Sequence, residues 1–177
     1  MQAGAVQSKL SEVWASLTGQ SCAFASSSSL PLLQEDDACF SLPITDGVTG
    51  YTNHNRALVL LQMGRADALA LAAAMFGLPA AELQPADLQD AGMELCNILS
   101  ACLLECLGDT SLSHLGLPEA QAHEAWRQLS QSAPALALYV SDDPAQRLAV
   151  MMIEISTVAG EAGLNPLPQP DGLSSEH

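Results

Sequence analysis

The spacing of apolar residues changes at Arg65, and this change constrains the fold more than any other feature. Residues 56–63 (R-A-L-V-L-L-Q-M) are apolar on both faces of an extended chain, which is typical of a central strand. From Arg65 onward, apolar residues recur every three to four positions, as they do in an amphipathic helix. A buried strand followed directly by helices predicts a domain in which helices cover a sheet.

Further strands and helices are expected on both sides of this change. Strand-like segments are residues 22–26, 39–44, 48–53 and 111–117, followed by the hairpin of residues 135–140 and 147–155. The sequence T-D-G at residues 45–47 predicts a turn. Helices are expected at residues 4–18, 66–76 and 85–107, whereas residues 119–131 fit either a helix or an irregular segment. This order predicts an α+β fold, with a largely antiparallel sheet covered by two consecutive helices.

The length of the chain fits one domain. Its 177 residues and 49% apolar content are enough for a sizeable core. Beyond residue 160 the sequence is rich in proline and has no periodicity. We therefore expect a single domain at residues 1–160 and a disordered tail at residues 161–177.

The charge of the chain excludes several classes of partner. Five Lys and Arg against twenty Asp and Glu give a formal net charge of -15, which opposes binding to nucleic acid and to anionic membranes. The longest apolar run, residues 68–76, is too short to cross a bilayer. The first residues lack the basic and apolar regions of a signal peptide. We therefore expect a cytoplasmic protein that binds neither nucleic acid nor membrane.

The cysteines do not indicate a disulfide framework. They are odd in number and three of them fall on one expected helix: Cys22, Cys39, Cys96, Cys102 and Cys106. The first interpretation is that they are small apolar core residues kept reduced. Zinc binding by Cys102 and Cys106 is a second interpretation, but no C-x-x-C pair or suitably spaced histidine accompanies them. We therefore predict no metal site.

The expected helix at residues 85–107 has a polar stripe. Asp90, Glu94, Asn97, Ala101 and Glu105 are spaced by four, three, four and four residues, so they share one side of the helix. The opposite side is apolar. This pattern is typical of a helix that packs on a core and presents its other face outward.

Each polar residue of the stripe also has an ordinary explanation. Acids near a helix N-terminus favour the helix dipole, which would account for Asp90, and Glu94 fits a solvated helix surface. Asn97 is the informative residue, because asparagine inside a helix competes with the backbone and carries a local cost. A satisfied polar contact would explain it without any function.

The pattern D-x-x-x-E-x-x-N on a helix, followed by a strand that ends at a proline, resembles the signature of the CheC, CheX and FliY phosphatases of bacterial chemotaxis. The matching residues are Asp90, Glu94, Asn97 and Pro118. The preceding segment A-L-A-L-A-A-A-M-F-G-L is similar to the helix before the family's catalytic helix. The single motif copy indicates the CheX-like branch, and the similarity spans about residues 20–160. Ala101 replaces a residue that is often glycine, and Pro118 comes two residues early.

The resemblance implies a CheX-like fold and dephosphorylation of the phospho-aspartate of a CheY-like receiver domain. Asn97 would be the catalytic residue that orients a water for in-line attack, and Glu94 would anchor the receiver's lysine. Asp90 and Ala101 would contact the partner. The protein would need no cofactor of its own, since the receiver supplies Mg²⁺, and it would be a homodimer with a shared sheet.

Two other functions remain compatible with the same residues. The chain could be a noncatalytic module that binds a receiver through Glu94 and Asn97 without accelerating hydrolysis. It could also be a small-molecule sensor that uses the fold without any receiver.

Overall fold

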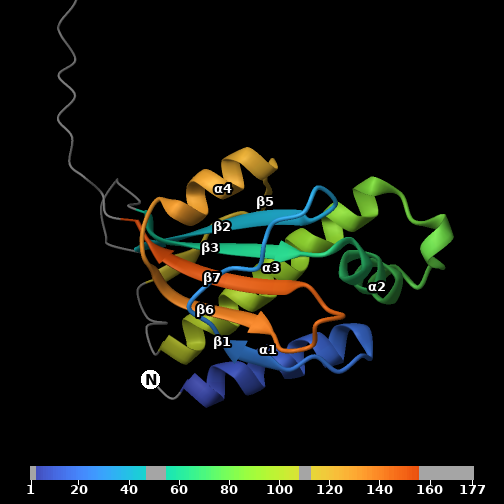
Figure 1. Ribbon diagram of the computed structural model, residues 1–177, viewed down its shortest axis with the longest axis horizontal. Helices are drawn as coiled ribbons and strands as arrows, with labels where there is room; N and C mark the ends of the chain where they lie inside the picture. The colour runs from blue at the N-terminus through green and yellow to red at the C-terminus, as the bar shows by residue number, and fades with distance from the viewer. Residues whose placement is uncertain (1–2, 47–54, 108–112, 156–177) are drawn as a thin grey trace, which may run out of the picture.

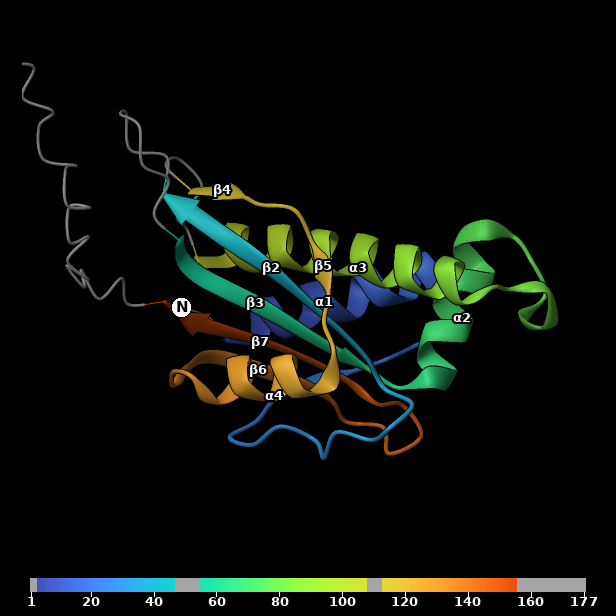
Figure 2. The ribbon, with the colours of Figure 1, turned by 90° about the horizontal axis from the view of Figure 1, so that it is seen from above.

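The computed structural model describes residues 3–46, 55–107 and 113–155. The strands form one antiparallel seven-stranded sheet (Figure 1), which has several helices on one face and a single helix on the other (Figure 2). The elements in chain order are α1 (Ala3–Thr18), β1 (Phe24–Ser26), β2 (Ala38–Asp46), β3 (Asn55–Met63), α2 (Arg65–Phe76), the 3-10 turn η1 (Ala80–Glu82), α3 (Pro85–Leu107), β4 (Ser113–Leu115), β5 (Glu119–Ala120), α4 (His123–Gln131), β6 (Ala135–Ser141) and β7 (Leu148–Glu154).

The strand β3 lies in the middle of the sheet. The strand order is β1-β6-β7-β3-β2-β4, and β5 also pairs with β2. β3 is hydrogen-bonded to β2 on one side and to β7 on the other, both antiparallel. This confirms the prediction that residues 56–63, which are apolar on both faces, form a central strand.

The first face of the sheet carries the larger core. Successive strand side chains point to opposite faces, so Val59 and Leu61 of β3 face the helices α1, α2 and α3. Leu10 and Trp14 of α1 and Leu95 of α3 are buried against them. Figure 2 shows α1 and α3 on one side of the sheet and α4 on the other.

The helix α3 approaches β2 closely at Gly92. A Cβ atom added there would overlap the ring of Phe40 on β2. Glycine therefore allows the helix to pack directly on the aromatic ring. Because this contact fixes which side of α3 faces the sheet, the opposite side of the helix is turned to solvent.

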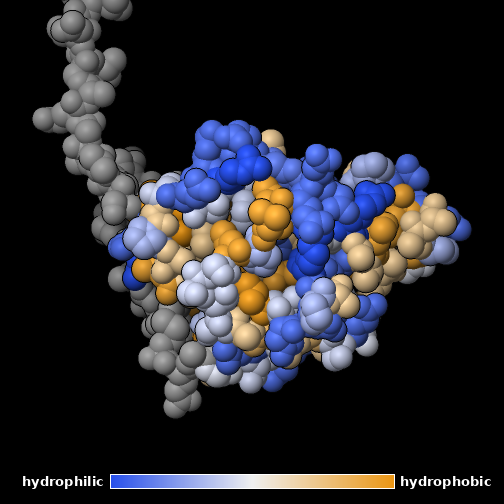
Figure 3. Space-filling model, viewed as in Figure 1, coloured by the Kyte–Doolittle hydropathy of each residue, from blue (hydrophilic) through white to orange (hydrophobic). Residues whose placement is uncertain are grey.

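The second face of the sheet carries a smaller core. Leu58 and Leu60 of β3 point to this side and pack in one cluster with Trp126 of α4, which is 3% exposed. On this side of the molecule, apolar patches lie between hydrophilic surfaces such as that of α4 (Figure 3). The helix α4 thus covers only part of this face, whereas α1, α2 and α3 cover the other face more fully.

A buried ion pair closes the end of the sheet where β2 begins and β3 ends. The side chain of Asp37 is fully buried, and its two oxygens accept hydrogen bonds of 2.5 and 2.6 Å from Arg147 Nη2. Asp37 Oδ2 also accepts hydrogen bonds from Gln62 Nε2 at 2.8 Å and from the backbone N–H of Gln34 at 3.0 Å. This network joins three segments that are far apart in the sequence.

The predicted order of elements is confirmed, with local differences. Residues 119–131 contain both the short strand β5 and the helix α4. The turn predicted at residues 45–47 is wrong at its start, because Thr45 and Asp46 continue β2 and pair with β4. This pairing overrides the local turn preference. The strand predicted at residues 48–53 and the tail at residues 161–177 lie outside the described residues.

Candidate functional site

The helix α3 begins with residues that favour a helix start. Pro85 occupies its first position, where a missing N–H costs little. The carboxylate of Asp87 accepts a hydrogen bond of 2.7 Å from the backbone N–H of Gln84. The helix then continues for 23 residues to Leu107 and carries the whole predicted stripe.

The two principal candidate residues lie on the solvent side of α3. Glu94 is exposed and Asn97, one turn later, is partly exposed. Their neighbours on the opposite side, Leu95, Cys96 and Leu99, are buried. The predicted division of this helix into an apolar back and a polar front is therefore confirmed.

The side chains of Glu94 and Asn97 are not engaged by the rest of the described chain. Within residues 3–46, 55–107 and 113–155, neither side chain has a hydrogen bond or an ion-pair partner. A satisfied internal contact therefore does not explain Asn97 in this part of the chain. An acid and a carboxamide, one turn apart and facing solvent, can bind and orient a partner group or a water.

The remaining motif residues lie around this pair. Asp90 is exposed one turn before Glu94, and Ala101 is partly exposed one turn after Asn97. Asp87, and not Asp90, makes the carboxylate hydrogen bond at the helix start. Pro118 lies in the segment between β4 and β5, which runs beside α3 (Figure 2).

The surface of α3 is acidic. Asp87, Asp90, Glu94 and Glu105 lie along it, and the sequence has no Lys or Arg between Arg65 and Arg127. Opposite charges at short range attract, and the segment of residues 66–126 that contains α3 supplies no Lys or Arg of its own to neutralise these acids. The face is therefore complementary to a basic surface.

The cysteines of the described residues are core residues, as predicted. Cys22, Cys39, Cys96 and Cys102 are buried and form no disulfide bond with one another. Burial raises the pKa of the Cys22, Cys39 and Cys96 thiols to about 12, so that each stays protonated at neutral pH and is a poor nucleophile or metal ligand. Among the described residues, no group of three His, Cys, Asp or Glu could hold a metal ion. The side chain of Cys106 lies outside the described part.

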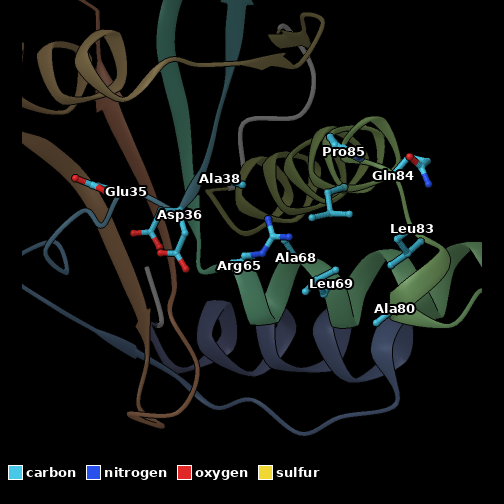
Figure 4. Close-up of a pocket in the computed structure, with 12 residues that line it drawn as sticks. Glu35, Asp36, Ala38, Arg65, Ala68, Leu69, Ala80, Leu83, Gln84 and Pro85 are labelled. Atoms are coloured by element: carbon cyan, nitrogen blue, oxygen red, sulfur yellow. The ribbon is translucent and has the colours of Figure 1, made fainter.

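A separate groove of about 330 Å³ lies near the N-terminal end of α3. Figure 4 shows the acidic Glu35 and Asp36 on one side of it, Leu83 and Gln84 on the other, and Arg65 between them. None of the predicted stripe residues lines this groove. This groove is therefore separate from the candidate site, which is the exposed face of α3.

Two features near the site were missed by sequence reasoning. Gly92 lies within α3 and allows this helix to pack directly on Phe40. A glycine within an otherwise strong helix is a sequence signal that could have predicted this close contact. Leu117, beside Pro118, is 82% exposed, and nothing in the local sequence indicates this.

Comparison with known structures identifies the class of fold, which is that of the CheX and CheC-like chemotaxis proteins. A structure of the CheX-CheY-BeF3-Mg²⁺ complex from Borrelia burgdorferi matches with a TM-score of 0.59 at 11% identity, over 85% of this chain and 96% of that chain.

Two further structures agree. A CheC-like superfamily protein from Shewanella sp. PV-4 gives a TM-score of 0.58 at 11% identity, over 86% of this chain and 96% of that chain. The chemotaxis protein CheX from Desulfovibrio desulfuricans matches with a TM-score of 0.54 at 13% identity, over 86% of this chain and 98% of that chain. No protein-family model and no curated protein matches the sequence. The α+β, CheX-like fold expected from the motif is thus confirmed by its structural neighbours.

No helix in the described part of the chain is long and apolar enough to span a membrane.

Proposed function

We propose that this protein is a CheX-like phosphatase that hydrolyses the phospho-aspartate of a CheY-like receiver domain. The observation that carries the proposal is the pair Glu94 and Asn97, one turn apart on the exposed face of α3 and without partners in the described residues. A structural neighbour of the same fold is a CheX in complex with CheY, which supports a receiver as the partner.

The proposed chemistry requires few groups. An acyl phosphate beside a divalent cation and a lysine needs mainly a water positioned for in-line attack. The Asn97 side chain has a carbonyl acceptor and an amide donor, so it can hold that water without forming a covalent adduct. A hundredfold acceleration corresponds to about 2.7 kcal/mol, which one oriented water can supply.

Glu94 would fix the orientation of the partner. Its carboxylate can accept a charge-assisted hydrogen bond from the receiver's lysine, and such bonds are about twice as strong as neutral ones. Asp90 and Ala101, on the same stripe, would contact the receiver on either side of the pair. The Mg²⁺ ion would belong to the receiver, and this chain would supply no metal of its own.

The decisive experiment follows phosphate loss from a phosphorylated receiver with Mg²⁺, with and without this protein. We expect the wild type to accelerate the loss and Asn97→Ala to remove about a hundredfold of that acceleration or more, while receiver binding is kept. Gln128→Ala is the matched control, because Gln128 is an exposed carboxamide on α4, on the other side of the sheet.

The same experiment separates the adaptor from the enzyme. If the wild type binds the receiver but leaves its rate of phosphate loss unchanged, the protein is a noncatalytic receiver-binding module. If Asn97→Ala is as active as Gln128→Ala, the carboxamide is not the catalytic group.

We further propose a cytoplasmic homodimer in which the sheets of two copies are continuous. β1 pairs only with Tyr139–Ser141 of β6 in the described residues, so the first residues of β6 have an edge on which a sheet can extend. Light scattering after size-exclusion chromatography should give twice the mass of 18.4 kDa. A single-copy mass at micromolar concentration would exclude this assembly.

A further inference from the structure

Leu117 is a large apolar side chain at an unusual position. It is 82% exposed and lies between β4 and β5, next to the proline of the motif. Single exposed leucines are common on protein surfaces and need no explanation by themselves. Leu117 is of interest because of its position relative to the candidate site.

The segment that carries Leu117 is held firmly. Both β4 and β5 pair with β2, and the backbone N–H of Gly116 donates a 2.7 Å hydrogen bond to the carbonyl of Pro43. A Cβ atom at Gly116 would lie 2.6 Å from Pro43 Cγ, so glycine is required for this close approach. Leu117 is therefore presented from a braced segment, which lowers the entropy lost when it binds a partner.

The sheet register places Leu117 beside the part of α3 that carries Asn97. Phe40 of β2, which lies under Gly92, pairs with Ala120, and Ile44, further along β2, pairs with Leu115. α3 runs along β2 in the same direction (Figure 2). Leu117 lies between these two pairs, so it is alongside the helical turns that follow Gly92.

The flank of α3 that faces this segment is partly apolar. Gln89 lines a cavity together with Ala120 and Gln121, which places its side of the helix next to β5. Met93, one turn further on the same side, is only partly buried against the core. Met93 thus places one partly buried apolar side chain on the side of α3 that faces β5.

We propose that Leu117 is an apolar docking residue for the receiver domain, on the surface that also bears Glu94 and Asn97. This inference rests on the proposed function. The acids of α3 favour a basic partner face, because residues 66–126 contain no Lys or Arg, and the exposed leucine favours an apolar contact within that face. The occupant is the receiver domain of the proposed function, since a structural neighbour of the same fold is a CheX in complex with CheY, and its docking face would combine both features.

The test compares Leu117→Ser with Leu32→Ser. Leu32 is 85% exposed and lies in the segment between β1 and β2, where Leu30 and Leu33 pack on the α4 side of the sheet, so the two substitutions remove the same exposed group at different places. We expect Leu117→Ser to weaken binding of the phosphorylated receiver about tenfold, which is what burial of a leucine side chain supplies. Leu32→Ser should bind as the wild type does.

The readouts are the receiver dissociation constant, the rate of phosphate loss at saturating receiver, and the mass of the free protein. A docking role raises the dissociation constant and leaves the saturated rate and the mass unchanged. Equal binding by both variants, with an active wild type, overturns the role of Leu117 and leaves the proposed function standing. No binding by the wild type overturns both, and a change of mass in Leu117→Ser alone assigns Leu117 to a subunit interface instead.

Discussion

Two groups of polar side chains in this molecule are placed in opposite ways. Asp37 is fully buried, and its oxygens accept hydrogen bonds from Arg147, Gln62 and the backbone of Gln34. Glu94 and Asn97 face solvent and have no partner in the described residues. A polar group whose partners are all internal can stabilise the fold but cannot act on another molecule. A polar group without internal partners can act outward.

The largest expected effect on stability comes from removing Asp37 from the buried network. Asp37→Ala should lower the free energy of unfolding by about 3 kcal/mol, at the lower end of the range for broken buried ion pairs because Arg147 keeps some exposure. Chemical denaturation measures this. Asp36→Ala is the control, since Asp36 is 54% exposed and only 3.8 Å from Arg147 Nη1. Equal effects of the two variants would show that the buried pair contributes nothing beyond a surface charge.

Disturbing the contact between α3 and the sheet should give the second largest loss of stability. Gly92→Ala places a methyl group against the ring of Phe40, and overpacking of this kind costs about 1–3 kcal/mol. Thermal unfolding should show a lower melting temperature. The double variant Gly92→Ala with Phe40→Leu should recover part of the loss. A variant as stable as the wild type would mean that α3 shifts outward freely.

A substitution in the exposed stripe should change the affinity for the receiver and leave the stability of the fold unchanged. Glu94→Ala should weaken receiver binding roughly tenfold, since a hydrogen bond to a charged group contributes about 1.5 kcal/mol, and should leave the melting temperature unchanged. Titration of the receiver at two salt concentrations should also show that added salt weakens receiver binding by the wild type more than it weakens binding by the variant. Tight binding that persists in Glu94→Ala would remove its anchor role.

The smallest effect is expected at Asp67. Burial raises the pKa of this carboxyl above its usual value, although Asp67 Oδ2 accepts a 2.7 Å hydrogen bond from the backbone N–H of Arg147. A raised pKa means that this group favours the folded state at low pH and loses that contribution as the pH rises through the folded pKa.

Asp67→Asn keeps an acceptor oxygen and removes the buried charge. It should therefore raise the melting temperature slightly at pH 7, and the gain should shrink as the pH falls toward 4. Melting curves of both proteins across this range test the sign. A gain in melting temperature that grows as the pH falls would contradict a raised pKa of Asp67.

Local pattern was sufficient for the elements and for the stripe. Residues 56–63 are apolar on both faces, which is typical of a strand in the interior of a sheet that is covered on both sides, and this made its central position predictable. Helical spacing alone placed Glu94 and Asn97 on the side away from the apolar residues. Periodicity failed at residues 45–46, because pairing with β4 involves a segment almost seventy residues away.

The sequence by itself determined the order of strands and helices and which residues share the polar stripe, because both depend on neighbours within a few turns. Only the tertiary structure decided that Asp37 meets Arg147, 110 residues later, and that the segment carrying Leu117 runs beside α3. Such pairs depend on sheet register and on the approach of α3 to β2, and neither is encoded in the spacing of nearby residues.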